Sequence, residues 1–138
     1  MGRVLAFDYG TKRVGIAATD PNGIIATAVG TVMVHEVFPF LKKYLVDEQV
    51  DRFVVGDPRQ SDNSPSESAP AVEEFVARLK REYPAIPIDR IDERFTSKLA
   101  QRSLIDSGVR KMERRDKGLV DQVSAVLILQ SWMETRRD

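Results

Sequence analysis

An aspartate at the end of an apolar strand constrains this chain more than any other feature of its sequence. The run from Val4 to Phe7 is typical of a buried strand, yet Asp8 follows it directly and a turn at Gly10 comes next. A buried carboxylate is unfavourable unless it holds a proton, pairs with a cation or binds a metal ion. The rest of the sequence must therefore supply a partner for Asp8.

The pattern of apolar residues and turn formers predicts an α/β fold. Three closely spaced apolar runs indicate an antiparallel meander, after which strands and amphipathic helices alternate. The last helix is apolar nearly all round and should be buried, and the polar segment 58–70 is the one long loop. The expected strands are 3–9, 13–19, 24–32, 52–56 and 86–91, and the expected helices are 35–48, a helix from about Val72 to Leu79, 97–107 and 119–136.

This order of elements implies a mixed central five-stranded sheet with helices on both faces. The first strand would pair with the second on one side and with the fourth on the other, which makes it central. Asp8 then lies at the C-terminal end of the central strand, where open sheets bind their ligands.

Length and composition exclude several classes of protein. A chain of 138 residues predicts one domain, residues 1–138. The absence of cysteine excludes disulfides, zinc–thiolate sites and cysteine nucleophiles. We find no signal peptide and no apolar run long enough to span a bilayer, so we expect a cytoplasmic protein with no membrane partner.

The charge of the chain is balanced overall but uneven along its length. The formal net charge is zero, which by itself does not indicate a nucleic-acid-binding protein. Between Arg94 and Lys117, however, eight basic residues stand against three acidic ones, a local excess of +5. A solvated helix face is the ordinary explanation of such a run, so its position relative to the carboxylates decides its meaning.

Two more carboxylates are expected at the same edge of the sheet as Asp8. Glu93 comes just after the fifth strand, and Asp121 opens the last helix, on one stripe with Ala125 and Ile128. Taken singly, each has an ordinary explanation as a helix-terminal acid or half of an ion pair, and Asp8 could pair with Lys12 or Arg13. Three carboxylates in one place, however, favour a cation between them, and oxygen ligands suit Mg²⁺ or Mn²⁺.

Three motifs resemble those of the YqgF family of RNase H-like nucleases. They are the stretch DYGTKRVGIA from Asp8 to Ala17, the triplet Asp92-Glu93-Arg94, and Val120-Asp121 followed by Ser124-Ala125 and Ile128-Leu129. The resemblance covers the whole chain and implies an RNase H-like fold. It also implies that Asp8, Glu93 and Asp121 are the catalytic, metal-binding acids. One departure is Asp57, which stands where the family usually has leucine.

The family is linked both to pre-16S ribosomal RNA processing and to Holliday-junction resolution. The resemblance therefore implies a two-metal nuclease whose products carry a 5′ phosphate, with Asp8 bridging two Mg²⁺ or Mn²⁺ ions. Precursor ribosomal RNA and ribosomal particles are the expected partners, and branched DNA is the alternative. Residues placed to meet the nucleic acid are Thr11, Lys12, Arg13, Arg94, Arg114, Arg115 and Lys117.

Two other functions stay open at this point. An ATPase or kinase of the actin and sugar-kinase type also begins with an aspartate before a glycine turn, but it needs a second domain. A non-catalytic RNA- or ribosome-binding module would not need the acid triplet.

A monomer is preferred over a dimer, because the sequence shows no exposed apolar helix and no long edge strand with which to build an interface.

Overall fold

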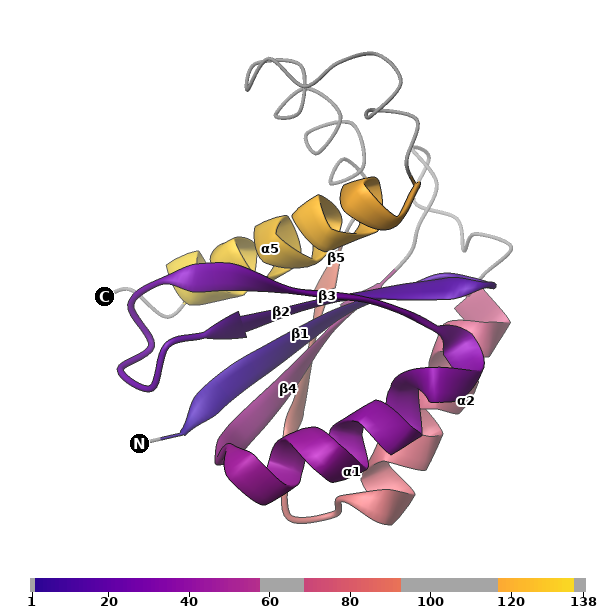
Figure 1. The fold of residues 1–138 in the computed structure, drawn as a ribbon, viewed down its shortest axis with the longest axis horizontal. Coiled ribbons are helices and arrows are strands. Elements are labelled where there is room, and N and C mark those ends of the chain that lie inside the picture. Colours follow the sequence, from indigo (N-terminus) through magenta and orange to yellow (C-terminus); the bar gives the residue numbers. More distant parts are fainter. Residues whose placement is uncertain (1, 58–68, 93–116, 136–138) are drawn as a thin grey trace.

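The computed structural model describes residues 2–57, 69–92 and 117–135 of the chain. A five-stranded sheet lies at its centre, with the strand order β3-β2-β1-β4-β5. Helices α1 and α2 cover one face of the sheet and α5 covers the other (Figure 1). The strands are β1 (Arg3–Tyr9), β2 (Arg13–Thr19), β3 (Ala26–Met33), β4 (Val50–Asp57) and β5 (Ile88–Asp92), and the helices are η1 (Val34–Glu36), α1 (Val37–Asp47), α2 (Ala69–Glu82) and α5 (Lys117–Thr135).

Strand β1 occupies the middle of the sheet, as the sequence predicts. It pairs antiparallel with β2, where Asp8 lies opposite Gly15, and parallel with β4, where Phe7 lies opposite Val55. The mixed sheet with helices on both faces is confirmed. No helix within the described residues is long and apolar enough to cross a membrane.

Alternate residues of β1 contribute to two separate cores. Leu5 and Phe7 pack under α1 and α2, whereas Val4 and Ala6 pack under α5. Because side chains alternate along a strand, Asp8 follows Ala6 to the face that α5 covers. The fold therefore directs the carboxylate toward the last helix.

Aromatic rings fill the core between the sheet and the first two helices. Phe75 of α2 lies at their centre, with Phe7 and Phe38 packed edge-on at ring-centroid distances of 5.3 and 5.8 Å. Tyr9 stacks on the same ring at 4.5 Å. The four apolar residues that predicted this helix are all buried: Val72, Phe75, Val76 and Leu79.

Several element boundaries differ from the expected ones. Strand β4 extends from Val50 to Asp57 because backbone pairing continues past its apolar run. Helix α2 begins at Ala69, and Pro70 stands in its first turn, where a missing backbone N–H costs nothing. Helix α5 is not enclosed on all sides, since Gln130 and Ser131 are exposed. The expected helix 97–107 lies outside the described residues, as does most of the expected loop 58–70.

The expectation of no long edge strand is wrong. Strand β3 has eight residues, and its outer side borders no other strand of the described sheet. Val29 and Met33 are exposed along it, and Ile24 and Ile25 are exposed in the turn that precedes it. A bulge interrupts β3, because Ile16 pairs with Gly30 whereas the next residue, Ala17, pairs with Ala28. The expectation of a monomer can therefore not rest on the absence of a long edge strand.

We expect Phe75→Ala to lower the free energy of unfolding by about 3–5 kcal/mol, because the substitution removes the ring around which the aromatic core packs. Urea denaturation followed by circular dichroism measures this loss. Phe40→Ala is the matched control, since Phe40 is only half-buried and its truncation should cost clearly less. Equal losses in the two variants would contradict the central role of Phe75.

Candidate functional site

Three strands carry an aspartate at the same end of the sheet. Because β1, β4 and β5 are mutually parallel, their C-terminal ends coincide. Asp8 is the second-last residue of β1, Asp57 ends β4, and Asp92 ends β5 directly opposite Asp57. The turn that follows β1 also lies at this end, which we call the carboxyl end of the sheet.

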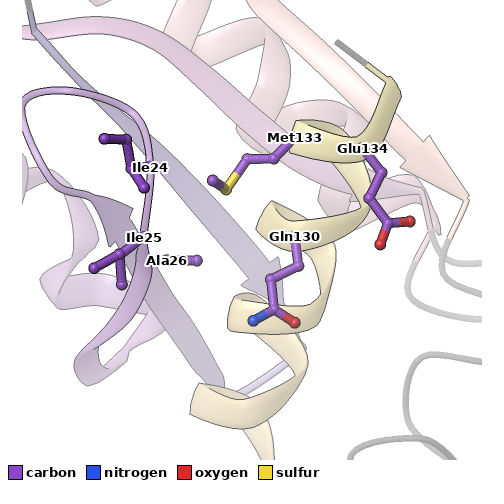
Figure 2. A pocket seen from close by; sticks show the side chains of 6 residues that line it. All are labelled: Ile24, Ile25, Ala26, Gln130, Met133 and Glu134. Atoms are coloured by element: carbon purple, nitrogen blue, oxygen red, sulfur yellow. The ribbon is translucent and has the colours of Figure 1, made fainter. Parts of the chain in front are cut away.

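Helix α5 begins at the carboxyl end of the sheet. Its C-terminal residues Gln130 and Met133 lie beside Ile24 and Ala26, past the N-terminal end of β1 (Figure 2). The helix therefore runs antiparallel to β1, and its first turn lies at the end where Asp8 stands (Figure 1). The positive end of the helix dipole favours negative charge there.

The position of Asp121 in α5 agrees with the stripe expected from the sequence. Ala125 and Ile128, four and seven residues further along, are both fully buried against the sheet. Positions at this spacing share one side of a helix, so the backbone of Asp121 lies on the sheet-facing side. Asp8 and Asp121 thus come from the two elements that meet at the carboxyl end of the sheet on the α5 face.

Asp57 and Asp92 belong to the opposite face of the sheet. Phe53 and Val55 pack under α1 and α2, and Asp57 continues the same alternation. The Asp57 carboxylate lies 3.6 Å from the Arg90 guanidinium, and that same guanidinium donates to Glu73 of α2 at 2.9 Å. Asp57 is therefore near the carboxyl end of the sheet, as expected, but it takes part in an ion pair on the face away from Asp8.

The turn after β1 is built around Gly10. The Gly10 N–H donates to the Arg13 carbonyl at 2.9 Å, and a Cβ on Gly10 would lie 2.9 Å from that same oxygen. No side chain fits there without a shift of the backbone. The Val34 N–H donates to the Lys12 carbonyl at 3.0 Å, which ties the turn to η1. Thr11 and Lys12 are exposed at the tip of this turn, and Arg13 is half-buried.

Tyr9, the neighbour of Asp8, has a perturbed phenol. Burial raises its pKa, and the nearby Glu74 carboxylate raises it further. Tyr9 is on the α2 face with Phe7 and stacks on Phe75, so its ring packs in the scaffold. This leaves Asp8 as the polar side chain that the end of β1 presents to α5.

Of the remaining expected site residues, some lie outside the described residues and others are described by their backbone alone. Glu93, Arg94, Arg114 and Arg115 lie outside the described residues. Lys117 and Asp121 lie in the first turns of α5, where only the backbone is described. Among the described side chains, no three acidic or histidine residues are grouped to hold a metal ion. The structure therefore brings together the Asp8 side chain and the backbone of α5 around Asp121.

Sequence reasoning missed the polar residues of β5. The strand IDRID places Asp89 and Arg90 in half-buried positions, where Asp89 contacts Arg52 and Trp132 and Arg90 contacts Asp57 and Glu73. These partners lie far apart in the sequence, so only the pairing of the strands brings them together. The available signal was a strand with charged residues on both of its faces, which indicates cross-strand ion pairs.

A hollow of about 430 Å³ lies at the other end of the molecule. It is lined by Ile24, Ile25, Ala26, Gln130, Met133 and Glu134 (Figure 2). The lining has no basic residue to bind a phosphate, and it lies beyond the N-terminal end of β1. We do not take this hollow as the candidate site, because the strand ends that carry the aspartates and the start of α5 lie at the opposite, carboxyl end of the sheet.

Comparison with known proteins agrees with this geometry. The solved structure of Thermus thermophilus RuvC in complex with a Holliday junction substrate matches with a TM-score of 0.59, covering 98% of each chain at 14% identity. At that identity the match concerns the fold alone, which is RNase H-like as expected.

Close relatives match along almost the whole chain. Proteins of Parabacteroides distasonis and Porphyromonas gingivalis are 51% and 50% identical, cover 99% and 97% of this chain, and match over 98% and 97% of their own lengths. Both are named "Putative pre-16S rRNA nuclease". The model of the family described as "RuvX: Holliday junction resolvase" matches residues 2–135. The chain therefore belongs to the RuvX family, the YqgF family whose motifs its sequence carries.

Proposed function

We propose that this chain is a divalent-metal-dependent nuclease that hydrolyses phosphodiester bonds during 5′-end processing of pre-16S ribosomal RNA. The observation that carries the proposal is the meeting of Asp8, near the end of the central strand, with the N-terminal part of α5, in which Asp121 is the fifth residue. Family membership supports the hydrolytic reaction. The names of the close relatives favour precursor ribosomal RNA as the substrate.

The acids of this end suit a hard cation. Carboxylate oxygens are the ligands that Mg²⁺ and Mn²⁺ prefer, and the positive end of the α5 dipole favours negative charge at this end of the sheet. Asp8, Glu93 and Asp121 would hold the metal, which when bound lowers the pKa of an attacking water and stabilises the departing 3′ oxygen. The products would then carry a 5′ phosphate and a 3′ hydroxyl.

The turn after β1 and the start of α5 supply positive charge beside these acids. Lys12 is exposed at the tip of the turn, and Lys117 is the first residue of α5. In the proposed function both bind phosphates of the RNA backbone, together with Thr11 and Arg13. The basic residues Arg94, Arg114 and Arg115 would extend this contact along the bound RNA. The net charge of zero does not oppose RNA binding, because the excess of +5 between residues 94 and 117 is local.

Resolution of a four-way DNA junction is the second candidate function. The family description favours it, and the exposed edge strand β3 offers a surface through which two copies could pair. We prefer ribosomal RNA because the relatives that bear that name are about half identical to this chain. A monomer in the cytoplasm would suffice for cutting one RNA strand, whereas symmetric junction cutting needs a dimer.

A side-by-side cleavage assay tests the proposed function. We expect the purified chain to cut a pre-16S 5′-leader RNA with Mg²⁺ or Mn²⁺, to lose that activity with a chelator, and to leave a synthetic four-way junction uncut. Light scattering on the same sample should report a monomer. Symmetric nicking of the junction by a stable dimer would favour the resolvase, and RNA binding without cleavage of either substrate would favour a non-catalytic module.

We expect Asp8→Asn, Glu93→Gln and Asp121→Asn each to reduce cleavage to background while leaving the circular dichroism spectrum unchanged. These acids hold metal in the proposed mechanism and repel one another without it, so their removal should raise the melting temperature slightly in metal-free buffer. Asp92→Asn is the matched control, because Asp92 adjoins Glu93 but belongs to the α2 face. Full activity in any of the three variants would remove that residue from the set.

We expect Asp57→Leu to retain cleavage within severalfold of the wild type. Asp57 pairs with Arg90 on the face away from Asp8, and Glu73 keeps its own contact with Arg90 in the variant. The pair is partly exposed, so its loss should cost about 1 kcal/mol or less. Asp57→Asn, which retains the shape of the side chain, is the control. Loss of all activity in Asp57→Leu, with an unchanged melting temperature, would place Asp57 in the reaction itself.

A further inference from the structure

A carboxylate near the start of β5 connects α5 to two strands. Trp132, near the C-terminal end of the helix, donates its indole N–H to Asp89 Oδ2 at 2.6 Å. Arg52 of β4 donates to Asp89 Oδ1 at 3.0 Å. Each carboxylate oxygen therefore has a donor from a different element. We call these three residues the Asp89 lock.

The lock differs in kind from the other contacts beneath α5. Ala125, Ile128 and Leu129 of the helix pack on small and aliphatic residues of the sheet such as Ala6 and Ala17. Apolar burial stabilises such a contact but does not depend on direction. A hydrogen bond to a charged acceptor does depend on direction, and it is stronger than a neutral one. The lock can therefore fix the rotation and axial position of α5, which the apolar surfaces alone define less sharply.

Trp132 and Asp121 occupy the same side of α5. They are eleven residues apart, which corresponds to about three turns and about 17 Å along the axis. A helix of this length transmits a rotation from one end to the other, because its backbone hydrogen bonds keep it stiff. A change in the rotation of α5 at Trp132 would consequently move Asp121 around the axis, away from or toward Asp8.

We propose that Asp89 is a positioning residue for the nuclease site: by holding Trp132 and Arg52 it fixes α5 on the sheet, and so fixes where Asp121 stands relative to Asp8. The inference rests on the proposed function, in which Asp121 holds a metal ion. Asp89 is the second residue of β5, three residues before the carboxyl end of the sheet, so the role proposed for it is to position α5 and not to hold the metal.

The partial exposure of the Asp89 lock allows an effect on the position of α5 to be distinguished from an effect on the stability of the fold. The Arg52 and Asp89 side chains are 29% and 28% exposed, and partly exposed ion pairs contribute modestly to stability. A hollow of about 390 Å³, lined in part by Asp89, Ile91 and Trp132, borders the contact and gives the released indole room to turn. Loss of the lock should therefore disturb the position of α5 more than the stability of the fold.

The chain offers a direct probe and a matched control. Trp132 is the one tryptophan in the sequence, so intrinsic tryptophan fluorescence reports on the lock alone. The ion pair between Arg3 and Glu48 resembles that of Arg52 and Asp89, at 2.9 Å with exposed fractions of 27% and 38%, and neither residue packs under α5. Glu48→Ala thus removes a comparable carboxylate without touching the helix.

The experiment compares Asp89→Ala, Trp132→Phe and Glu48→Ala with the wild type. Trp132→Phe keeps an aromatic ring, removes the donor and makes the side chain smaller. We expect the two lock variants to weaken Mn²⁺ binding, measured by calorimetry without substrate, by about threefold to tenfold, at or below the range typical of residues that orient metal ligands. The half-saturating Mn²⁺ concentration for cleavage should rise by the same factor, with melting temperatures like that of Glu48→Ala.

Two further readouts do not depend on activity. Asp89→Ala should shift the tryptophan emission maximum, and amide hydrogen exchange in the first half of α5 should become faster in both lock variants but not in Glu48→Ala. Unchanged exchange in α5 would overturn the proposal even if cleavage were lost. Faster exchange with unchanged Mn²⁺ affinity in an active enzyme would overturn the positioning role. If the wild type neither binds Mn²⁺ nor cleaves, the proposed function fails, and with it the site that Asp89 is proposed to position.

Discussion

The parallel pairing of β1 with β4 is the constraint on which the rest of the structure depends. It places β1 inside the sheet with a helical layer over each face, so a polar side chain can leave this strand only near its ends. At the N-terminal end, the Arg3 guanidinium bonds Glu48 and the Thr19 carbonyl, and the Gly2 N–H bonds Asp51. At the C-terminal end stands Asp8. Polar groups at the N-terminal end of the strand thus hold the scaffold, and the proposed function places the reaction at the other end.

The two faces of the sheet differ in how they pack. Aromatic rings from Phe7, Phe53 and Phe75 fill the space under α1 and α2, whereas alanines at 6 and 17 meet Ala125 of α5. Small residues let a helix approach a sheet closely, and the close approach brings the start of α5 to the end of β1. The aromatic core under α1 and α2 contributes most to packing, whereas the small residues under α5 determine how closely the helix of the candidate site approaches the sheet.

The sequence predicts those parts of the fold that depend on local patterns. The bounds of β1 and β2 agree with the expectation to the residue, because short apolar runs flanked by a glycine turn define them. The face on which Asp57 lies was not predictable in the same way, since Phe53, Val54 and Val55 are all apolar and the sequence does not tell which helical layer each of them meets. The contact between Asp89 and Trp132 spans 43 residues and likewise has no local signal. Asp8 stands out as a candidate because a carboxylate at the end of a buried strand conflicts with its surroundings, and such a conflict is visible in the sequence itself.

The bulge in β3 has a consequence for how this protein behaves at high concentration. An uninterrupted edge strand is a template on which a second copy can add, strand by strand. In β3 the extra residue Val29 divides the hydrogen-bonded pairing with β2 into two short stretches, whose registers differ by one residue. A straight strand from another molecule can match one stretch but not both. A bulge is one of the features by which edge strands avoid open-ended pairing, so the apolar residues exposed on β3 do not by themselves make it a template for fibres.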